Sequence, residues 1–449
     1  MKPRDLALAA LNRAENSPGH PERYLEQAFQ QDPSLTQRDR SLTVYLVQGV
    51  LRWRLRLDWI IHRSVRFPFK NITPPVLNIL RIAVCQILFM DRIPDSAAVN
   101  EAVKQAKASE APHVVSSVNG ILRDICRKKN EGSFPDRGKD PVRFLSVFYS
   151  YPEWLVKKWM RELGMDSAER LLEAENHLPT LVVRTNRLKI NRPDLIRYLT
   201  QEGIEARPTP YSPEGTEIRG LGGPIQEMEA FRRGLFQVQG EAAQICSHLI
   251  SPKPGESILD LCAGLGGKST HMAELMGNEG RIVALDKNHG RLVKLARSSR
   301  RLGITSVEPI VGNAGDSLRN IFRRSFDKIL MDGPCSNLGT ISRHPDAKWT
   351  RDEADIKRLA ILQKAILNGS PALLQTGGCL LYVTCTISKD ENEGVVNDFL
   401  KNNREMTLEN LKDHIPEWGI ELIDEKGFFR TFPHIHKMDG FFGALFKKT

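Results

Sequence analysis

The stretch LDLCAGLGGKST, residues 259–270, joins a short apolar strand to a helix through a loop that contains three glycines. Glycine lets the backbone approach a ligand closely, and the first turn of the helix adds a partial positive charge. From residue 257 onward, apolar segments alternate with helical ones; the predicted strands are SILDL, RIVALD, SVEPIV, FDKILMD and GCLLYVT. This alternation predicts an α/β fold with a doubly wound (Rossmann-like) parallel sheet, whose ligands bind beyond the carboxyl ends of the strands.

Two features of the glycine loop indicate its cofactor. The next predicted strand ends at Asp286, where a carboxylate can accept both hydroxyl groups of an adenosine ribose. A phosphate-binding NTPase loop needs a glycine where Cys262 stands, and a nicotinamide-binding loop needs G-x-G-x-x-G, which residues 264–269 do not complete. S-adenosylmethionine fits better, because it presents a ribose and an adenine without phosphates.

Two cysteines follow predicted strands of the same sheet, Cys335 in MDGPCSNLGT and Cys385 in YVTCTIS. A thiolate can add to the electrophilic carbon 6 of a pyrimidine, which makes carbon 5 able to attack a sulfonium methyl group. A second acid or base must then remove the carbon 5 proton, and a carboxyl such as Asp332 must steady the ring. These three residues are therefore the candidate catalytic groups. Burial as a small apolar residue is the alternative for either cysteine taken alone.

Composition limits the class of protein. The chain has 449 residues, 41% of them apolar, which predicts two or three globular domains. Its seven cysteines are scattered, without a C-x-x-C pair or zinc-finger spacing, so we expect reduced thiols and no metal site. The first residues lack the apolar core of a signal peptide, and no eighteen apolar residues run together. We therefore expect a cytoplasmic protein without a membrane segment.

The charge balance indicates a polyanionic partner. The formal net charge is +10, and residues 1–140 carry 22 Lys and Arg against 15 Asp and Glu. The stretch LRWRLRLDWIIHRSVRFPFK, residues 51–70, combines six cations with Trp53 and Trp59, groups that can pair with phosphates and stack on bases. The alternative is a helix that buries Leu51, Leu55 and Trp59, with its arginines facing water.

The chain divides into three predicted domains. In residues 1–135 the apolar residues recur with the spacing of helices, which predicts a helical domain. This region ends in a charged connection that contains Gly and Pro. Residues 141–235 begin with helical segments and continue as strand, helix and strand, which predicts a small α+β (ferredoxin- or RRM-like) domain. Residues 236–449 form the doubly wound core.

These motifs resemble those of a known family. DLCAGLGGK, MDGPCSNLGTISRHPDAKW and LLYVTCTISKDENE are similar to the cofactor, Pro-Cys and Thr-Cys motifs of the RNA cytosine-5 methyltransferases, of the ribosomal RNA small subunit methyltransferase B (RsmB or Sun) type. PDSAAVNEAVKQAK and SSVNGILR resemble the NusB-like helical domain of that type. The resemblance covers essentially the whole chain.

The resemblance implies a role for each candidate residue. Cys385 would be the nucleophile, Cys335 would assist release of the methylated base, and Asp332 would hold the cytosine edge and border the cofactor. Asp286 would bind the ribose of S-adenosylmethionine and Asn313 its adenine side. The residues implied to line the cofactor are Cys262, Ala263, Gly264, Leu265, Gly266, Gly267 and Lys268. The family usually has Ala-Pro at Gly264-Leu265 and aspartate at Asn313 and Gly240.

The implied function is methylation of carbon 5 of a cytosine in small-subunit (16S) ribosomal RNA by a monomer, through a covalent adduct at carbon 6. Another RNA such as tRNA, a noncatalytic RNA-binding or assembly factor, and a P-loop NTPase are the alternatives. Two further segments are interpreted from their residues. RHPDAKW, residues 343–349, is predicted to have a mixed role, in which Arg343, His344 and Lys348 line the RNA cleft while Pro345 and Trp349 brace the loop. SKDENEG, residues 388–394, is interpreted as the polar cap of a helix, with Asp390 and Glu391 in its first turn.

Overall fold

The computed structural model describes residues 2–16, 21–129, 134–316, 318 and 321–449. The chain forms two compact units. Met1–His177 and Ile341–Thr350 make the first, called the helical unit, and Leu178–Thr340 and Arg351–Thr449 make the second, called the α/β unit. In the described ranges, no helix combines the length and the apolar character that a bilayer crossing requires.

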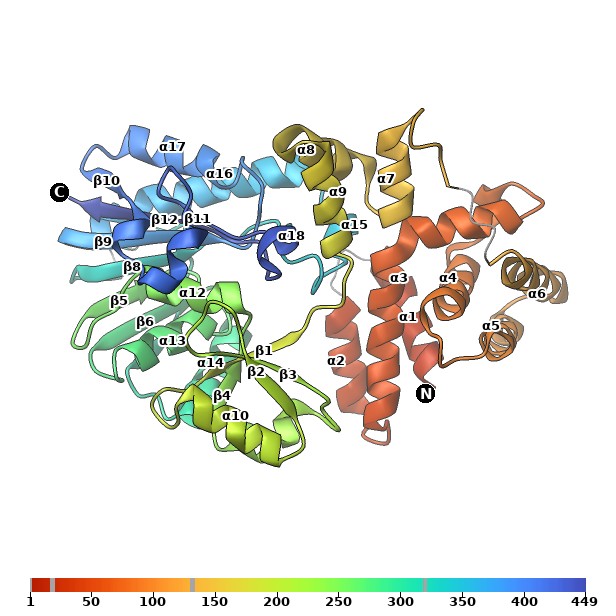
Figure 1. The fold of residues 1–449 in the computed structure, drawn as a ribbon, viewed down its shortest axis with the longest axis horizontal. Coiled ribbons are helices and arrows are strands. Elements are labelled where there is room, and N and C mark those ends of the chain that lie inside the picture. The colour runs from red at the N-terminus through yellow and green to blue at the C-terminus, as the bar shows by residue number, and fades with distance from the viewer. Residues whose placement is uncertain (1, 17–20, 130–133, 317, 319–320) are drawn as a thin grey trace. The chain divides into compact units, whose positions relative to one another are not determined.

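The helical unit is built around helix α4, which is buried over most of its length and contacts α1, α3, α5 and α6 (Figure 1). A helix that is apolar on all sides packs at the centre of a bundle, because each of its faces needs a partner. The elements are α1 (Pro3–Asn16), α2 (Pro21–Gln31), α3 (Gln37–Ser64), η1 (Phe69–Asn71), α4 (Pro74–Phe89), α5 (Asp95–Ser109), α6 (Pro112–Arg127), α7 (Pro141–Tyr149), α8 (Glu153–Leu163), α9 (Met165–Ala174) and α15 (Ala347–Thr350).

Helix α3 carries the basic stretch and departs from regular helical geometry at Trp53, where φ is −113° and ψ is 17°. After this kink a different face of the helix points inward, so Leu57 and Ile61 are fully buried. Leu55 and Trp59 are only half-buried. The predicted stripe of every fourth residue is therefore wrong beyond the kink.

The segment Ile341–Thr350 packs inside the helical unit, far along the chain from its neighbours. Lys348 is fully buried, and its Nζ donates hydrogen bonds to the carbonyl oxygens of Arg52 and Ser150 and to Oδ1 of Asn176, at 3.0, 3.2 and 2.7 Å. Burial lowers the pKa of Lys348 well below its ordinary value. The prediction that Lys348 lines an RNA cleft is wrong, because this side chain fastens the segment in place.

The same packing removes one arginine of the basic stretch from solvent. Arg52 is 2% exposed, and its two terminal nitrogens donate to the carbonyl oxygen of Ser342 at 3.2 and 2.8 Å. Its neighbour Arg56 lies over the rings of Trp53 and Phe148. The cations of this stretch that remain exposed are Arg63, Arg66 and Lys70.

The small part of the α/β unit is an antiparallel sheet in the order β2-β3-β1-β4 with one long helix. Val183, Leu195, Leu199 and Phe236 form its core. The predicted strand, helix and strand correspond to β1, α10 and β2. The elements are β1 (Leu181–Thr185), α10 (Arg192–Gln201), β2 (Glu205–Pro208), β3 (Gly215–Arg219), η2 (Ile225–Glu227), α11 (Glu229–Arg232) and β4 (Phe236–Val238).

The large sheet has the order β10-β12-β9-β8-β5-β6-β7, and β5 to β9 are parallel where they pair. All five predicted strands are present. They are β5 (Ser257–Asp260), β6 (Arg281–Asp286), β7 (Val307–Val311), β8 (Phe326–Asp332) and β9 (Leu374–Thr384), and β10 (Met406–Glu409), β11 (Phe429–Arg430) and β12 (Phe442–Lys448) complete the sheet. The order reverses at β5, with β6 on one side and β8 on the other. Ligands of such sheets bind at this reversal.

Helices cover both faces of the large sheet (Figure 1). Alternate strand residues point to opposite faces, so Ile258 and Ile282 pack against α12 and α13, whereas Leu259 and Val283 belong to the core that includes α16 and α17. The remaining elements are α12 (Glu241–Leu249), α13 (Gly267–Leu275), α14 (His289–Leu302), α16 (Glu353–Gly369), η4 (Pro371–Leu373), α17 (Glu393–Asn402), η5 (Leu411–Asp413), η6 (Glu417–Leu422) and α18 (Pro433–His436).

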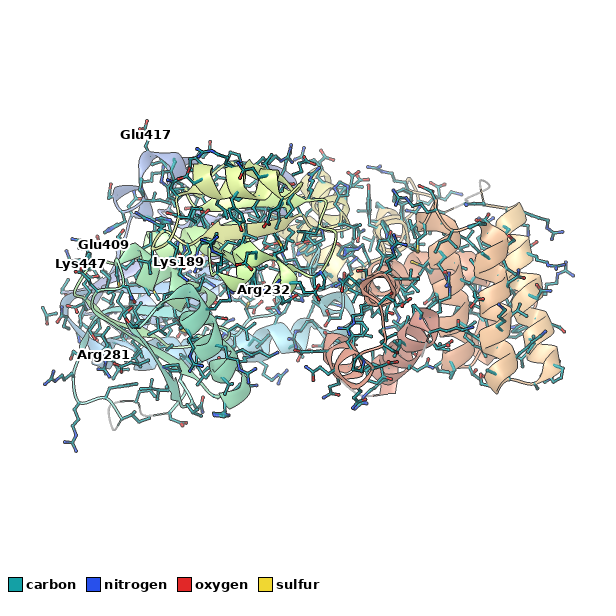
Figure 2. The ribbon with its side chains drawn as sticks, turned by 90° about the horizontal axis from the view of Figure 1, so that it is seen from below. Lys189, Arg232, Arg281, Glu409, Glu417 and Lys447 are labelled. Atoms are coloured by element: carbon teal, nitrogen blue, oxygen red, sulfur yellow. The ribbon has the colours of Figure 1, made fainter. Side chains whose placement is uncertain are left out.

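A buried ion pair attaches the small part to the core. Arg184 on β1 and Glu274 on α13 have no exposed side-chain area, and their charged groups lie 2.7 Å apart. Arg184 also donates to the carbonyl oxygen of Gly267 at 2.8 Å, where α13 begins. On the surface, Lys189 donates to the carbonyl oxygens of Arg233 and Arg301 and makes a second link between the small part and the core (Figure 2).

The outer edge of the large sheet carries charged side chains. β10 is the last strand on this side and pairs only with β12 among the described strands. Glu409 on β10 and Lys447 on β12 lie at this end of the α/β unit (Figure 2). Charges of this kind discourage an edge strand from pairing with another chain.

The domain boundaries near residues 135 and 235 were placed where the composition and pattern of the sequence change, and they stay predictions. By compactness, α7, α8 and α9, which the sequence analysis assigned to the second domain, belong to the helical unit. The packing of α7 against α3 accounts for this difference.

Candidate active site at the carboxyl edge of the sheet

The glycine loop lies between β5 and α13 and adopts the conformation that its glycines allow. Gly264 and Gly266 have φ of +58° and +78°, in the left-handed region. At Gly266 a Cβ atom would lie 2.4 Å from Cγ of Leu295, so no larger residue fits without rearrangement. At Gly264 nothing but the Cys262 carbonyl oxygen lies within 4.0 Å of such an atom. The loop is therefore packed closely at its helix end and open at its tip.

Asp286 joins the loop to the end of β6. Its Oδ2 accepts a hydrogen bond from the Gly264 backbone N–H at 2.9 Å, and its Oδ1 accepts one from the Asn288 N–H at 2.7 Å. A carboxylate has about four acceptor sites, so lone pairs remain for further donors. This geometry fits a carboxylate that holds the two hydroxyl groups of a ribose.

Lys268 and Asp332 connect the loop to the end of β8. Nζ of Lys268 lies 2.5 Å from Oδ2 of Asp332. Burial opposes the charge on Lys268, but the attraction of Asp332 outweighs it and raises the pKa of Lys268 above its ordinary value. The side chain of Asp332 is 32% exposed, so part of this carboxylate faces the solvent.

The two candidate thiols lie in contact. Sγ of Cys335 and Sγ of Cys385 are 3.1 Å apart, and Oδ1 of Asn337 lies 3.1 Å from Sγ of Cys385. The hydrogen bond with Cys335 and burial raise the pKa of Cys385 well above its ordinary value, and the charge of Asp332 acts in the same direction. The prediction that both thiols share one edge is therefore matched by the geometry, and the charge of Asp332 is felt at Cys385.

Glu391 holds the two cysteine loops together. Its carboxylate is fully buried and accepts hydrogen bonds from the backbone N–H of Ser336 at 2.8 Å, the Ser336 hydroxyl at 2.5 Å, the Thr386 hydroxyl at 3.2 Å and the Gln363 amide at 3.2 Å. Burial raises its pKa. Ser336 follows Cys335 and Thr386 follows Cys385, so one carboxylate sets the spacing of the thiols. The prediction that Glu391 lies in the first turn of a helix is wrong, because α17 begins at Glu393.

The structure brings most of the predicted site residues to one edge. Direct contacts join Gly264 to Asp286, Lys268 to Asp332 and Cys335 to Cys385. Cys262, Ala263 and Gly267 lie in the same loop, and Leu265 at its tip is 56% exposed. Asn313 follows β7 at the same edge, but its amide donates to Asp316 and accepts from the Gly315 N–H. Its role beside an adenine stays a prediction.

Two residues of the site were missed by the sequence analysis. Glu391 stands in a charged segment, SKDENEG, and nothing in that segment indicates an inward orientation. Asn337 adopts φ of +62°, a conformation that asparagine tolerates better than most residues. The pattern Pro-Cys-Ser-Asn therefore held one usable signal, an asparagine two residues after the cysteine in a predicted turn.

Known proteins match the whole chain. The family model of the 16S rRNA methyltransferases RsmB/F matches residues 247–447, that of the NusB family residues 1–127, and that of the RsmF/B-like ferredoxin-like domain residues 151–221. The probable ribosomal RNA small subunit methyltransferase B of Bacillus subtilis (strain 168) is 33% identical over 99% of this chain and 98% of its own length. The chain belongs to this methyltransferase family.

Other relatives agree with this assignment. The ribosomal RNA small subunit methyltransferase B of Escherichia coli O6:K15:H31 (strain 536 / UPEC) is 31% identical over 92% of both chains. The crystal structure of PH0851 has a TM-score of 0.82 and 29% identity, and covers 100% of this chain and 99% of that one. NSun6 from Pyrococcus horikoshii, solved with SFG, has a TM-score of 0.59 and 26% identity over 67% of this chain and 99% of its own. The predicted fold class is confirmed: a NusB-like helical domain, a ferredoxin-like middle domain and a doubly wound methyltransferase core.

The raised pKa of Cys385 gives a pH test. In the wild-type chain the thiol stays protonated at neutral pH, so we expect alkylation of Cys385 by iodoacetamide to be slow at pH 7–8 and to accelerate only as the pH approaches the raised pKa. Cys335→Ala removes the hydrogen bond and the neighbouring charge that raise this pKa, so alkylation of Cys385 at pH 8 should become about tenfold faster or more. Peptide mass spectrometry after timed labelling measures both rates, and a pH midpoint that does not move in Cys335→Ala contradicts the coupling.

Glu391→Gln tests the support of the thiol loops. The amide has about the same size, but its NH2 group faces hydrogen-bond donors that the carboxylate accepted, so the free energy of unfolding should fall by about 1–3 kcal/mol. Cys335, which is 9% exposed, should be alkylated several times faster. Glu353→Gln, at an exposed position of α16, is the matched control. Equal Cys335 labelling in the two variants would show that Glu391 does not hold the loops.

Proposed function

We propose that this protein transfers the methyl group of S-adenosylmethionine to carbon 5 of a cytosine in small-subunit (16S) ribosomal RNA. The observation that supports this most is the pair of sulfurs, 3.1 Å apart, beside a carboxylate that is bonded to the glycine loop. Relatives that are 31–33% identical over most of their length carry the name ribosomal RNA small subunit methyltransferase B. Such a reaction belongs to the cytoplasm, where we expect the enzyme to act as a monomer.

The glycine loop and Asp286 fit S-adenosylmethionine. The open tip at Gly264 leaves room for a ligand, and the free lone pairs of Asp286 can accept the ribose hydroxyl groups. SFG, present in the NSun6 structure, is an analogue of this cofactor. When bound, S-adenosylmethionine supplies a methyl group on a positively charged sulfur.

The chain's own residues provide the remaining chemistry. Sγ of Cys385 loses its proton to solvent and forms a bond to carbon 6 of the cytosine, beside Cys335, the nearest sulfur. Asp332 and Lys268 hold the polar edge of the ring and steady the charge that develops on it. After carbon 5 has taken the methyl group and Cys335 has lost its proton to solvent, Cys335 removes the carbon 5 proton. The bond between Cys385 and carbon 6 then breaks with its electron pair moving to sulfur, which restores the aromatic ring, and the released thiolate takes a proton from solvent.

The two thiols should behave differently when each is replaced. Cys385→Ala should abolish methyl transfer and form no covalent complex, because no sulfur remains to attack carbon 6. Cys335→Ala should form the adduct but release it slowly, with turnover reduced about 100-fold or more. Transfer of tritium from labelled S-adenosylmethionine to 16S RNA measures activity, and denaturing electrophoresis detects the adduct.

Cys379→Ala, at a half-buried cysteine within β9, is the control and should retain activity. The opposite distribution of adducts would exchange the roles of the two thiols. If the protein shifts RNA in a gel but incorporates no methyl group, it is an assembly factor. If only tRNA becomes labelled, the substrate is tRNA and not 16S RNA.

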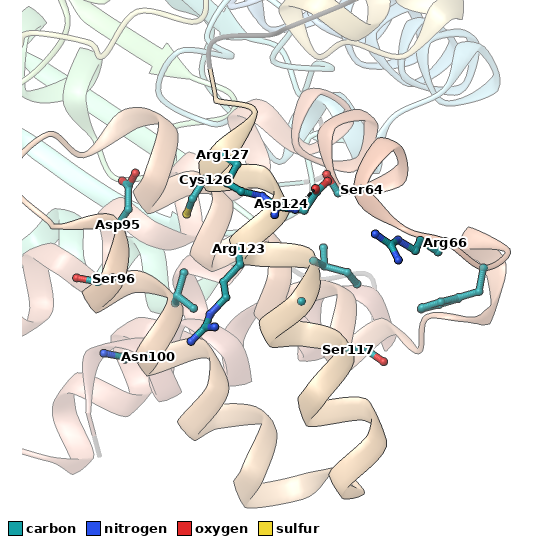
Figure 3. A pocket seen from close by; sticks show the side chains of 14 residues that line it. Ser64, Arg66, Asp95, Ser96, Asn100, Ser117, Arg123, Asp124, Cys126 and Arg127 are labelled. Carbon is teal, nitrogen blue, oxygen red and sulfur yellow. Dashed lines mark hydrogen bonds and ion pairs between the residues drawn. The ribbon is translucent and has the colours of Figure 1, made fainter.

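We further propose that the helical unit contacts the RNA backbone at a cavity of about 850 Å³ between α3, α5 and α6 (Figure 3). Arg66 and Arg123 lie on this cavity, and no carboxylate pairs with either of them among the described residues. Asp124, by contrast, is paired with Arg127 and Lys128 at 2.8 Å. Unpaired guanidinium groups beside hydroxyl and amide side chains suit phosphate oxygens.

Charge reversal at this cavity tests the contact. Arg66→Glu and Arg123→Glu should each weaken RNA binding and reduce the slope of log affinity against log salt by roughly 1, because each removes a phosphate contact. Arg38→Glu, at an exposed position at the other end of α3, should leave the slope unchanged. Filter binding of a 16S RNA fragment at several salt concentrations gives the slopes. Equal losses in all three variants would mean that only the total charge matters.

A further inference from the structure

Three side chains outside the active site converge between the small part of the α/β unit and its core. Glu214 stands between β2 and β3, His248 near the end of α12, and His271 in the middle of α13. Each of the three offers one atom that could bind a metal ion, and these three atoms all lie within 4.8 Å of one another. A search of the described ranges for such groups of histidine, cysteine and acidic residues finds this one. The spacing of the cysteines predicted no metal site, and these three residues, separated by 34 and 23 positions, form no motif that would have indicated one.

The two distances from Glu214 to the histidine nitrogens are close to those that a bound ion would impose. Nε2 of His248 lies 2.8 Å from Oε2 of Glu214, and Nε2 of His271 lies 3.8 Å from the same oxygen. In a tetrahedral zinc site with bonds of about 2.0–2.1 Å, neighbouring ligand atoms are about 3.3 Å apart. Shifts of roughly half an ångström would bring both pairs to that value.

Among the described residues, His271 has no hydrogen-bond partner. Its side chain has no exposed area, and neither ring nitrogen makes a hydrogen bond. A buried polar group without a partner is destabilising, and native proteins rarely tolerate one without a reason. Hydrogen bonding between His248 and Glu214 leaves this imidazole unsatisfied, whereas an ion between the three side chains would bond to it directly.

The protonation states suit metal binding. Burial, with the nearby charge of Arg184, lowers the pKa of His271 to about 3, so its ring is neutral and carries a free lone pair. Burial opposes ionisation of Glu214, but its hydrogen bond with His248 helps to lower its pKa below the ordinary value. A metal ion needs a neutral imidazole such as that of His271, together with an ionised carboxylate. The charge of Arg184 is balanced by Glu274 at 2.7 Å.

We propose that Glu214, His248 and His271 bind a divalent transition-metal ion, with zinc as the best match. Two imidazole nitrogens and one carboxylate oxygen are ligands that zinc accepts at tetrahedral angles. An open cavity of about 580 Å³ borders Glu214 and His248, so the ion can enter from solvent and a water molecule can take the fourth position.

The proposed ion has a structural role. It would link the β2–β3 connection of the small part to α12 and α13 of the core, next to the Arg184–Glu274 pair. Because α13 begins at Gly267 of the glycine loop, an ion at His271 would stiffen the helix on which that loop depends. Binding to the folded state alone would raise the unfolding temperature.

Metal analysis of the full chain, produced without a histidine tag, tests the site. After equilibration with zinc chloride and removal of free metal, we expect about one zinc per chain and an unfolding midpoint raised by roughly 5 °C or more. Cobalt chloride should give the visible absorption bands of a tetrahedral cobalt site. His248→Ala and the nearly isosteric Glu214→Gln should each lose the bound zinc and the rise in midpoint.

Two controls separate this site from others. His414→Ala breaks a histidine and glutamate pair at 3.3 Å elsewhere in the α/β unit and should keep the zinc. Cys335→Ser/Cys385→Ser should also keep it, because the thiols are not ligands. Circular dichroism establishes that each variant is folded. Zinc that persists in folded Glu214→Gln and His248→Ala, that disappears with the two thiols, or that fails to bind the wild-type chain overturns the proposal.

Discussion

A guanidinium with no exposed area, that of Arg184, is the interaction on which the α/β unit depends most. It belongs to β1 of the small part, yet it donates to Glu274, Thr270 and the Gly267 carbonyl oxygen on α13, as well as to Oε1 of Gln239. A buried charge of this kind is stable only when every donor is matched. These bonds fix the small part to the helix that follows the glycine loop. The position of the loop therefore depends on β1, a strand some eighty residues earlier in the chain.

The candidate active site uses the same physical device a second time. Glu391 is another buried charge, and it joins two loops that leave neighbouring strands. Because Ser336 and Thr386 are each adjacent to a cysteine, this carboxylate holds the two sulfurs 3.1 Å apart, within hydrogen-bond distance. Lys268 and Asp332 then connect this pair to the glycine loop. Ion pairs and shared hydrogen-bond acceptors thus hold the two thiols and the glycine loop close together, as the proposed reaction requires.

The elements that follow short-range rules were predictable from the sequence. Short apolar segments predicted the strands, and the carboxyl ends of parallel strands lie at one edge of a sheet. The sequence alone therefore placed four residues at that edge: Asp286, Asp332, Cys335 and Cys385. Lys348 and Glu391 were misjudged for one common reason. Each is a charged residue in a polar stretch of sequence, and only the fold determines its hydrogen-bond partners. Lys348, for example, donates to a carbonyl oxygen 296 residues away along the chain. The kink at Trp53 is similar, since it alters which face of α3 is buried and no proline of α3 marks its position.

The return of Ile341–Thr350 to the helical unit has a consequence for how the polypeptide can be dissected. The chain passes between the units after residues 177, 340 and 350, so the helical unit is not contiguous in the gene. A fragment that stopped at residue 177 would lack Lys348 and Trp349, and the carbonyl oxygens of Leu51 and Ser150 would lose these donors. The helical unit as a whole therefore takes two of its internal hydrogen-bond donors from a segment that is encoded between the two stretches of the α/β unit.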